Sequence, residues 1–321
     1  MKYFERFEDY LIPTQDKLFV KLCDMYKGKG GAMKNEFILV RGEAPVMLVA
    51  HLDTVHKEPV KNVCISQDGN IWMSPQGIGG DDRCGVYALN TIYERAKVKP
   101  WLLFTCNEEI GGIGAKSFCT AHGKGELPDG LDELKCLIEI DRKGKNDAVY
   151  YECDNEEFED YITGKGFITD WGTFTDISLI APELGVAAVN LSSGYYNAHT
   201  QYEYINRKEL DATIDRVLEI VDDAVKPDFP CYEYIEADYS ASWYGTGYYD
   251  WGKYYPSAVS KKHDSGFEYQ REYDALLEFH TSKELDKIRE ELGDAWIEYL
   301  FESEFGGSFD EVFGDEEEEE I

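Results

Sequence analysis

The ten residues from Val46 to Val55, with the sequence VMLVAHLDTV, constrain the fold more strongly than any other part of the chain. Positions 46–50 are all apolar, which is typical of a strand buried on both faces of a parallel sheet. The run ends in His51 and Asp53, which project from the same face of an extended backbone because they lie two positions apart. A carboxylate placed in this way can hold the ring of a metal-binding histidine. Taken alone, the pair also suits an ordinary histidine at the end of a strand.

Similar buried segments alternate with helical patterns along the first 225 residues. This alternation predicts an α/β fold, with a mixed, centrally parallel sheet and helices on both faces. The predicted strands are 36–41, 46–50, a hairpin within 60–73, 101–106, 135–140, 148–152 and 185–191. The predicted helices are 84–97, 115–122, 155–165 and 207–225, after a helical stretch over 3–27 that Pro13 interrupts. In such sheets ligands bind beyond the carboxyl ends of the parallel strands.

Composition narrows the choice of partner and of compartment. The 321 residues carry a formal net charge of −32, which argues against nucleic acids and anionic membranes as partners. The acidic N-terminal segment has no apolar core of signal-peptide length, and no run approaches the ~18 apolar residues of a membrane span. Eight scattered cysteines without Cys-x-x-Cys spacing suit free thiols in a reducing compartment. We therefore expect a soluble cytoplasmic protein that binds a small, cationic or metallic partner.

Polar residues gather where the predicted buried strands end. They are His51 and Asp53, the segments 79–83 and 107–112, Asp141, and the segment 194–199. Each has a plain alternative when taken alone: Asp81 and Asp82 suit a turn, and Glu108 and Glu109 suit a solvated loop. Their joint occurrence, at successive strand ends, favours a cation instead. Two histidines and several carboxylates suit zinc or a related divalent ion such as cobalt or manganese.

These segments resemble, in sequence and in order, the co-catalytic dinuclear zinc aminopeptidases. The resemblance rests on MLVAHLDTV (47–55), GDDRCG (80–85), FTCNEEIGGIGA (104–115) and NAH (197–199). The closest likeness within that clan is to the branches of peptidase T, the acetylornithine deacetylases and the glutamyl aminopeptidases. It covers roughly residues 36–225 and implies the zinc-dependent exopeptidase fold, which is also called phosphorylase/hydrolase-like.

The resemblance also implies a role for each matching residue. The implied metal ligands are His51, Asp81, Glu109, Asp141 and His199. Asp81 would bridge two divalent ions, most simply zinc, with His51 and Asp141 completing one site and Glu109 and His199 the other. Glu108 would be the general base, and Asp53 would orient His51.

The resemblance further bears on domain organisation. Many relatives insert a lid or dimerisation domain before the last histidine ligand, but only 58 positions separate Asp141 from His199. We therefore expect a single catalytic domain without an inserted lid over residues 1–228. Residues 226–321 carry 8 Lys/Arg against 26 Asp/Glu, and Tyr, Trp and Gly become frequent after Cys231. A connecting segment (229–264), a small helical hairpin (265–306) and an acidic tail (307–321) are predicted there.

The predicted function is that of a metal-dependent hydrolase, a metallopeptidase that acts as an aminopeptidase on short peptides. An N-acyl amino acid deacylase and a carboxypeptidase-type hydrolase remain alternatives with the same metals. A non-catalytic acidic binding protein is a third, against which the presence of Glu108 argues, since it is not an implied ligand. His56, Arg83, Arg142, Tyr195 and Tyr196 lie beside the ligands in sequence and could contact substrate or serve structure. The sequence leaves open whether the chain forms a homo-oligomer.

Overall fold

The computed structural model describes residues 3–34, 36–172 and 174–237, together with the single positions Leu276 and Ile297. The predicted helical hairpin and acidic tail, and most of the predicted connecting segment, lie outside these described residues. Among the helices of the described ranges, none combines the length and the apolar character that a membrane crossing requires.

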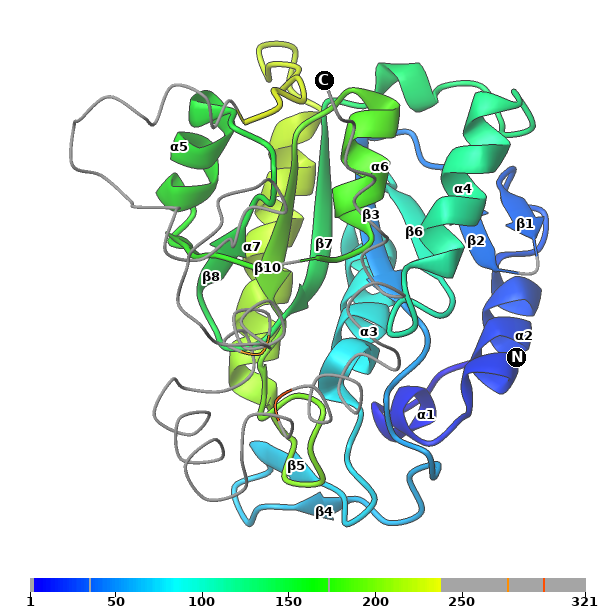
Figure 1. The fold of residues 1–321 in the computed structure, drawn as a ribbon, viewed down its shortest axis with the longest axis vertical. Helices are drawn as coiled ribbons and strands as arrows, with labels where there is room; N and C mark the ends of the chain where they lie inside the picture. The colour runs from blue at the N-terminus through cyan, green and yellow to red at the C-terminus, as the bar shows by residue number, and fades with distance from the viewer. Residues whose placement is uncertain (1–2, 35, 173, 238–275, 277–296, 298–321) are drawn as a thin grey trace. The chain divides into compact units, whose positions relative to one another are not determined.

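An eight-stranded sheet forms the centre of the molecule (Figure 1), with the strand order β1-β2-β6-β3-β7-β10-β8-β9. The strands are β1 (Ala32–Lys34), β2 (Phe37–Val40), β3 (Val46–His51), β6 (Trp101–Thr105), β7 (Cys136–Arg142), β8 (Asp147–Val149), β9 (Ile168–Thr169) and β10 (Ala188–Ser192). The four central strands β6, β3, β7 and β10 run parallel, whereas β2 pairs antiparallel with β6 and β8 pairs antiparallel with β10. The predicted α/β fold with a parallel centre is confirmed.

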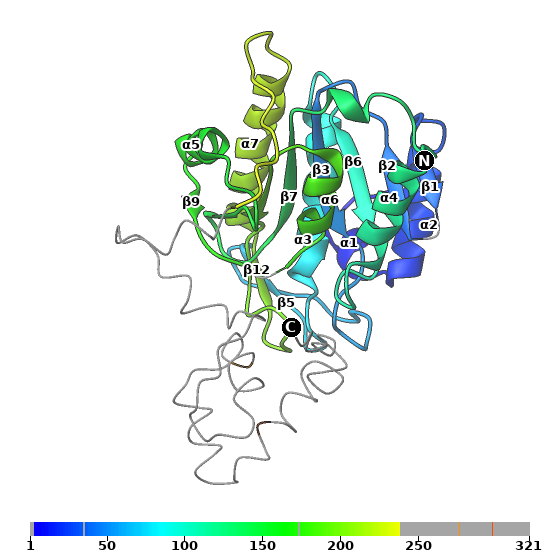
Figure 2. The ribbon, with the colours of Figure 1, turned by 45° about the horizontal axis from the view of Figure 1, so that its top comes forward.

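Helices cover both faces of this sheet (Figures 1 and 2). One face packs against α1 (Glu8–Leu11), α2 (Gln15–Tyr26), α3 (Gly80–Arg95), α5 (Glu156–Gly164) and α7 (Arg207–Ala224). The other face packs against α4 (Ile113–Gly123) and α6 (Ile177–Leu184), near the short 3-10 helix η1 (Leu131–Glu133). Leu48 belongs to the first core, and Met47 and Val49 belong to the second. Side chains alternate along a strand, so β3 must be apolar at every position to serve both cores.

A second, four-stranded sheet lies at the carboxyl ends of the central strands (Figure 1). It contains β4 (Cys64–Ile65), β5 (Ile71–Met73), β11 (Tyr195–Tyr196) and β12 (Tyr204–Asn206). The hairpin of β4 and β5 follows the prediction, but β12 adds to it by pairing antiparallel with β5. Because β11 follows β10 after only two residues, this small sheet fixes the loop between β11 and β12 beside the ends of the central strands.

Two stretches add to the expected organisation. Helix α6 occupies a region where no element was predicted, and it contains Pro182, which normally argues against a helix interior. Packing also continues past residue 228, since Phe229 and Tyr232 are buried and Tyr232 exchanges backbone hydrogen bonds with Lys135 and Ala187. The elements between Asp141 and His199 belong to the main sheet, its helices and the small sheet, so no lid domain is inserted there.

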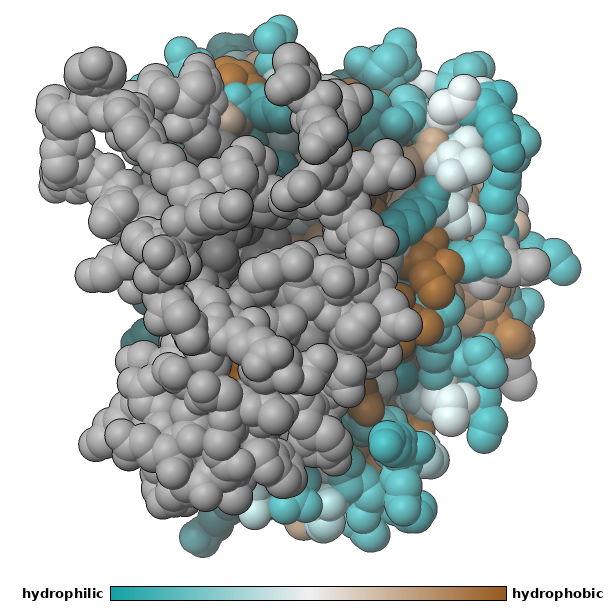
Figure 3. Space-filling view, viewed as in Figure 1, coloured by the Kyte–Doolittle hydropathy of each residue, from teal (hydrophilic) through white to brown (hydrophobic). Residues whose placement is uncertain are grey.

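Where Figure 3 shows described residues, most of this face is hydrophilic, with smaller apolar areas between the polar ones. All eight cysteines are free, and four of them are buried. Burial raises the pKa of the Cys84 thiol well above its usual value, and it raises that of Cys136 to about 12. These buried thiols therefore stay protonated and act as small apolar side chains.

Candidate metal centre

The carboxyl ends of the central strands carry all five residues predicted as metal ligands. His51 ends β3, and Asp141 lies near the end of β7. Asp81 lies at the start of α3, Glu109 in the loop after β6, and His199 in the loop between β11 and β12. Parallel strands present their carboxyl ends at one edge of the sheet, so these positions converge although they span 149 positions of the chain.

The five side chains form two groups that share Asp81. One group is His51, Asp81 and Asp141, and the other is Asp81, Glu109 and His199; within each group one ligand atom per residue lies within 4.8 Å of the others. Nε2 of His51 lies 3.1 Å from Oδ1 of Asp81. Nε2 of His199 lies 3.2 Å from Oδ2 of Asp81, so the shared carboxylate presents one oxygen to each group.

This donor set fits a pair of divalent cations. Imidazole nitrogens and carboxylate oxygens are the ligands that zinc, cobalt and manganese accept. Oδ1 of Asp141 and Oε1 of Glu109 are buried, and within the described residues neither has a hydrogen-bond partner. Buried carboxylate oxygens without partners are costly, and a cation in each group would satisfy them.

Asp53 supports both groups from behind. Its Oδ1 lies 3.3 Å from Nδ1 of His51, and its two oxygens accept hydrogen bonds from the backbone N–H groups of Glu108 and Glu109 at 3.0 and 3.1 Å. Burial alone would raise the pKa of Asp53, but these hydrogen bonds outweigh it and lower the pKa below the usual value. Asp53 therefore stays ionised and fixes the His51 ring together with the loop that carries Glu109.

Glu108 lies beside the two groups and belongs to neither of them in the described structure. Its Oε2 is 3.9 Å from Nε2 of His51, and its side chain is 12% exposed. Burial raises the pKa of Glu108 to about 9, with repulsion from Asp141 adding to the effect and His51 opposing it. Burial, followed by the charge of Asp81, likewise raises the pKa of Asp141 to about 8. Without cations, the buried carboxylates here outnumber the positive groups that could neutralise them. Bound cations would lower the pKa values of Glu108 and Asp141 again.

Five further residues were named as candidates for substrate contact, and each has a partner within the protein. They are His56, Arg83, Arg142, Tyr195 and Tyr196. The guanidinium of Arg83 is buried and donates to the carbonyl oxygens of Tyr10 and Pro13, both at 2.8 Å. The hydroxyl of Tyr195 donates to the backbone oxygen of Asp141. Arg83 and Tyr195 therefore serve to hold the site together.

Several buried carboxylates of the site were not predicted. Oδ2 of Asp82 accepts from the backbone N–H of His51 at 3.3 Å. Glu139 is fully buried and accepts from the Thr175 hydroxyl at 2.8 Å. Glu139 precedes Asp141 by two positions on β7, a spacing that places both on one face of the strand and could have revealed it. A third, Glu203, precedes β12 in a polar loop, where no local pattern distinguishes it.

A cavity of about 490 Å³ adjoins the centre on the side of Asp53 and Glu109. Its apolar wall contains Leu11, Val55, Val60, Ile78 and Ile110. Lys57 and Glu58 add opposite charges to the lining. The cavity is large enough for a small ligand or for one or two amino-acid residues.

No protein-family model matches the chain, and no curated protein matches its sequence. Solved structures with a similar fold include the aminopeptidase PepT from Bacillus cereus (14% identity, 68% of this chain and 97% of that chain, TM-score 0.49). A tripeptidase from Staphylococcus aureus is similar over 68% of this chain and 96% of its own, with 15% identity and a TM-score of 0.49. The TET1 peptidase from Pyrococcus horikoshii is similar over 68% of this chain and 99% of its own, with 12% identity and a TM-score of 0.49. All three solved structures are of peptidases.

Proposed function

We propose that this chain is a metal-dependent hydrolase of peptide bonds, and more specifically an aminopeptidase that acts on short peptides with two divalent cations, most simply zinc. One observation carries the proposal. Asp81 directs one oxygen to each of two ligand groups, while Glu108 lies 3.9 Å from His51 of the first group and belongs to neither group. Shared carboxylates of this kind hold pairs of cations, and the neighbouring free carboxylate can move a proton.

Two divalent cations in these groups would lower the pKa of a water molecule between them and would polarise the carbonyl of a peptide bond. Glu108 would accept the proton of the attacking water and deliver it to the leaving amine. Positive charge nearby would lower the pKa of Glu108 from the value of about 9 that burial gives it, leaving it ionised near neutral pH.

Asp53 selects the tautomer that the His51 ring takes when it is neutral. Nδ1 faces the ionised Asp53, so the proton of a neutral ring is held on that nitrogen. Nε2 is then left with its lone pair toward Asp81 and Asp141, which is the form that binds a metal. Asp53 thus contributes through the orientation of His51.

The charges around the centre favour recognition of an ammonium group. Arg83 is held by backbone carbonyls, and Arg142 forms an ion pair with Asp170 at 2.7 Å. Both guanidinium groups are therefore already paired within the protein, which favours a substrate read at its amino end over one read at its carboxylate. Lys57 on the cavity wall is the observation that favours the second candidate, a deacylase or carboxypeptidase that reads a substrate carboxylate.

Three matched substrates separate these candidates: a free tripeptide, its N-acetylated form and its C-terminal amide. We expect the zinc-loaded enzyme to cleave the free tripeptide and the amide but not the acetylated form, because acetylation removes the ammonium charge. Hydrolysis of the acetylated form as fast as the free one would contradict the aminopeptidase proposal and favour the deacylase. The Glu108→Gln variant, purified in parallel, controls for contaminating peptidases.

A further inference from the structure

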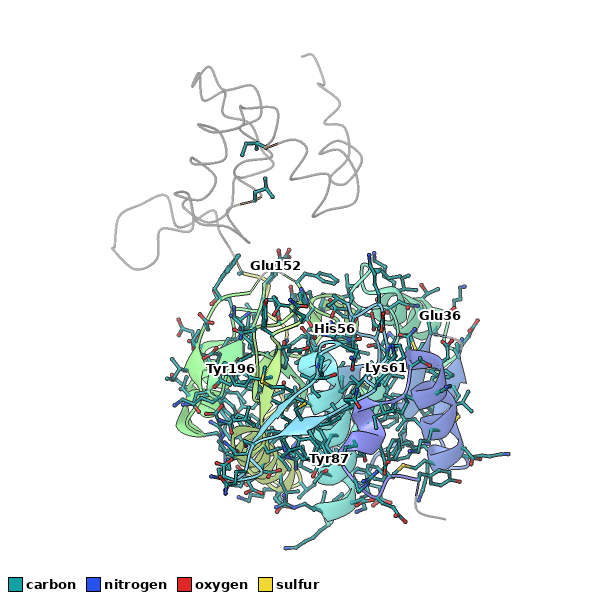
Figure 4. The ribbon with its side chains drawn as sticks, turned by 90° about the horizontal axis from the view of Figure 1, so that it is seen from below. Glu36, His56, Lys61, Tyr87, Glu152 and Tyr196 are labelled. Atoms are coloured by element: carbon teal, nitrogen blue, oxygen red, sulfur yellow. The ribbon has the colours of Figure 1, made fainter. Side chains whose placement is uncertain are left out.

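Glu203 is a fully buried carboxylate on which three N–H donors converge. Its Oε1 accepts from the backbone N–H of Asp81 at 3.0 Å. Its Oε2 accepts from the backbone N–H of Gly79 at 2.8 Å and from Nε2 of His56 at 2.7 Å. His56 is labelled in Figure 4. Glu203 is not in either ligand group, yet it binds the backbone of the residue that both groups share.

The same residue belongs to the loop that carries His199. The backbone N–H of Glu203 donates to the carbonyl oxygen of Thr200 at 3.2 Å and closes the turn directly after His199. The side chain of Glu203 therefore holds the loop that leads to Asp81, and its main chain holds the loop that carries His199. The two ligands joined in this way, Asp81 and His199, both belong to the second group, where their ligand atoms lie 3.2 Å apart.

The loop before Asp81 packs too closely to shift independently of Glu203. A Cβ atom on Gly80 would lie 3.2 Å from Oε1 of Glu203 and 2.6 Å from Cβ of Tyr195. A Cβ atom on Gly77 would lie 2.2 Å from Cε1 of His56. The loop at Gly77 and Gly80 is therefore in close contact with His56, Glu203 and Tyr195. We expect a displacement of the Glu203 carboxylate to displace Asp81 as well.

We propose that Glu203 is a positioning residue that sets the Asp81–His199 geometry and thereby the affinity of the second group for its cation. The inference rests on the proposed two-cation function. A carboxylate is required because it offers acceptors to all three donors, whereas a glutamine would turn its NH₂ group toward one of them. His56 serves as the third donor and holds the carboxylate in place. The first group depends on Glu203 only through Asp81 and should be affected less.

The test compares Glu203→Gln with Glu209→Gln. Glu209 is a matched control because it also accepts a hydrogen bond near the site, from the Tyr196 hydroxyl at 2.6 Å, but within the described part of the chain it makes no hydrogen bond to the Asp81 loop. Zn²⁺ is titrated into the metal-free full chain by calorimetry, and Co²⁺ absorption spectra report ligand geometry. We expect the wild type and Glu209→Gln to bind two ions alike. We expect Glu203→Gln to bind one of the two ions about 10- to 100-fold less tightly and the other with a smaller loss, and to change the Co²⁺ spectrum.

Unchanged Zn²⁺ affinities in Glu203→Gln, or equal losses at both ions, would overturn the positioning role. A wild type that binds no Zn²⁺ would instead refute the proposed function. Near-UV circular dichroism shows whether each metal-free variant is folded. If Glu203→Gln does not fold, the Zn²⁺ titration is repeated with His56→Phe, which removes one hydrogen-bond donor and keeps the Glu203 carboxylate. We expect a smaller loss at the same ion in His56→Phe, and wild-type affinity there would overturn the proposal.

Discussion

Replacing Glu108 by glutamine should remove turnover while leaving metal binding and folding intact. Glutamine keeps the shape and polarity of the side chain but cannot accept the proton of the attacking water. Loss of a general base costs about 10²- to 10⁴-fold in rate, equivalent to about 3–5 kcal/mol of transition-state stabilisation. Oε2 of Glu108 lies 3.9 Å from Nε2 of His51, and Glu108 is in neither ligand group, so no ligand is lost.

The stability of the same variant provides an independent check. Burial raises the pKa of Glu108 to about 9, so the metal-free fold gains nothing from its charge. The free energy of unfolding of metal-free Glu108→Gln should therefore be no lower than that of the wild type. The rate of peptide hydrolysis, the zinc content and the free energy of unfolding in urea would be measured on the same preparation.

Glu109→Gln is the matched comparison for Glu108→Gln. Glu109→Gln changes the same chemical group one position further on, but Oε2 of Glu109 lies 3.1 Å from Nε2 of His199 in the second ligand group. We expect this variant to lose zinc as well as activity. A Glu108→Gln enzyme that keeps near-normal turnover, or that loses zinc as Glu109→Gln does, would refute the assignment of the base.

Two further predictions concern stability. Burial and the charge of Asp81 raise the pKa of Asp141 to about 8, so between about pH 4 and 8 the folded chain holds a proton that the unfolded chain has released. The free energy of unfolding of the metal-free protein should therefore fall as the pH rises from 5 to 8, as measured by urea titration in the presence of a chelator. Added Zn²⁺ should offset this loss. A metal-free protein whose stability rises with pH would contradict this reasoning. Phe229→Ala should cost about 3 kcal/mol, since the Phe229 ring is only 8% exposed and packs edge-on against Tyr161, whereas an unchanged denaturation midpoint would show that packing ends before residue 229.

The parts of the site that follow from local pattern could be predicted from the sequence. His51 and Asp53 meet because a strand places alternate residues on one face, and the apolar run before them identifies the strand. Asp141 follows a similar run in β7. The meeting of these strand ends follows from the general behaviour of parallel sheets. These features made the fold class and the clustering of polar strand ends accessible from the sequence, whereas the choice of the five ligands came from the resemblance to the dinuclear zinc aminopeptidases.

Contacts that depend on long-range pairing could not be predicted. The position of Glu203 follows from β12 pairing with β5, in which Ile205 lies opposite Trp72. Nothing in the short segments of either strand indicates this pairing. Helix α6 was missed for a different reason, since Pro182 within it is a strong local signal against a helix that tertiary packing overrides.

Metal analysis of purified protein by inductively coupled plasma mass spectrometry tests the central claim most directly. After equilibration with Zn²⁺ and removal of free ion, the wild type should contain about two ions per chain, because two ligand groups share Asp81. His51→Ala and His199→Ala should each retain about one, and Asp81→Ala should retain little, since both groups include it. A wild type with no bound zinc, or full occupancy in both histidine variants, would contradict the account.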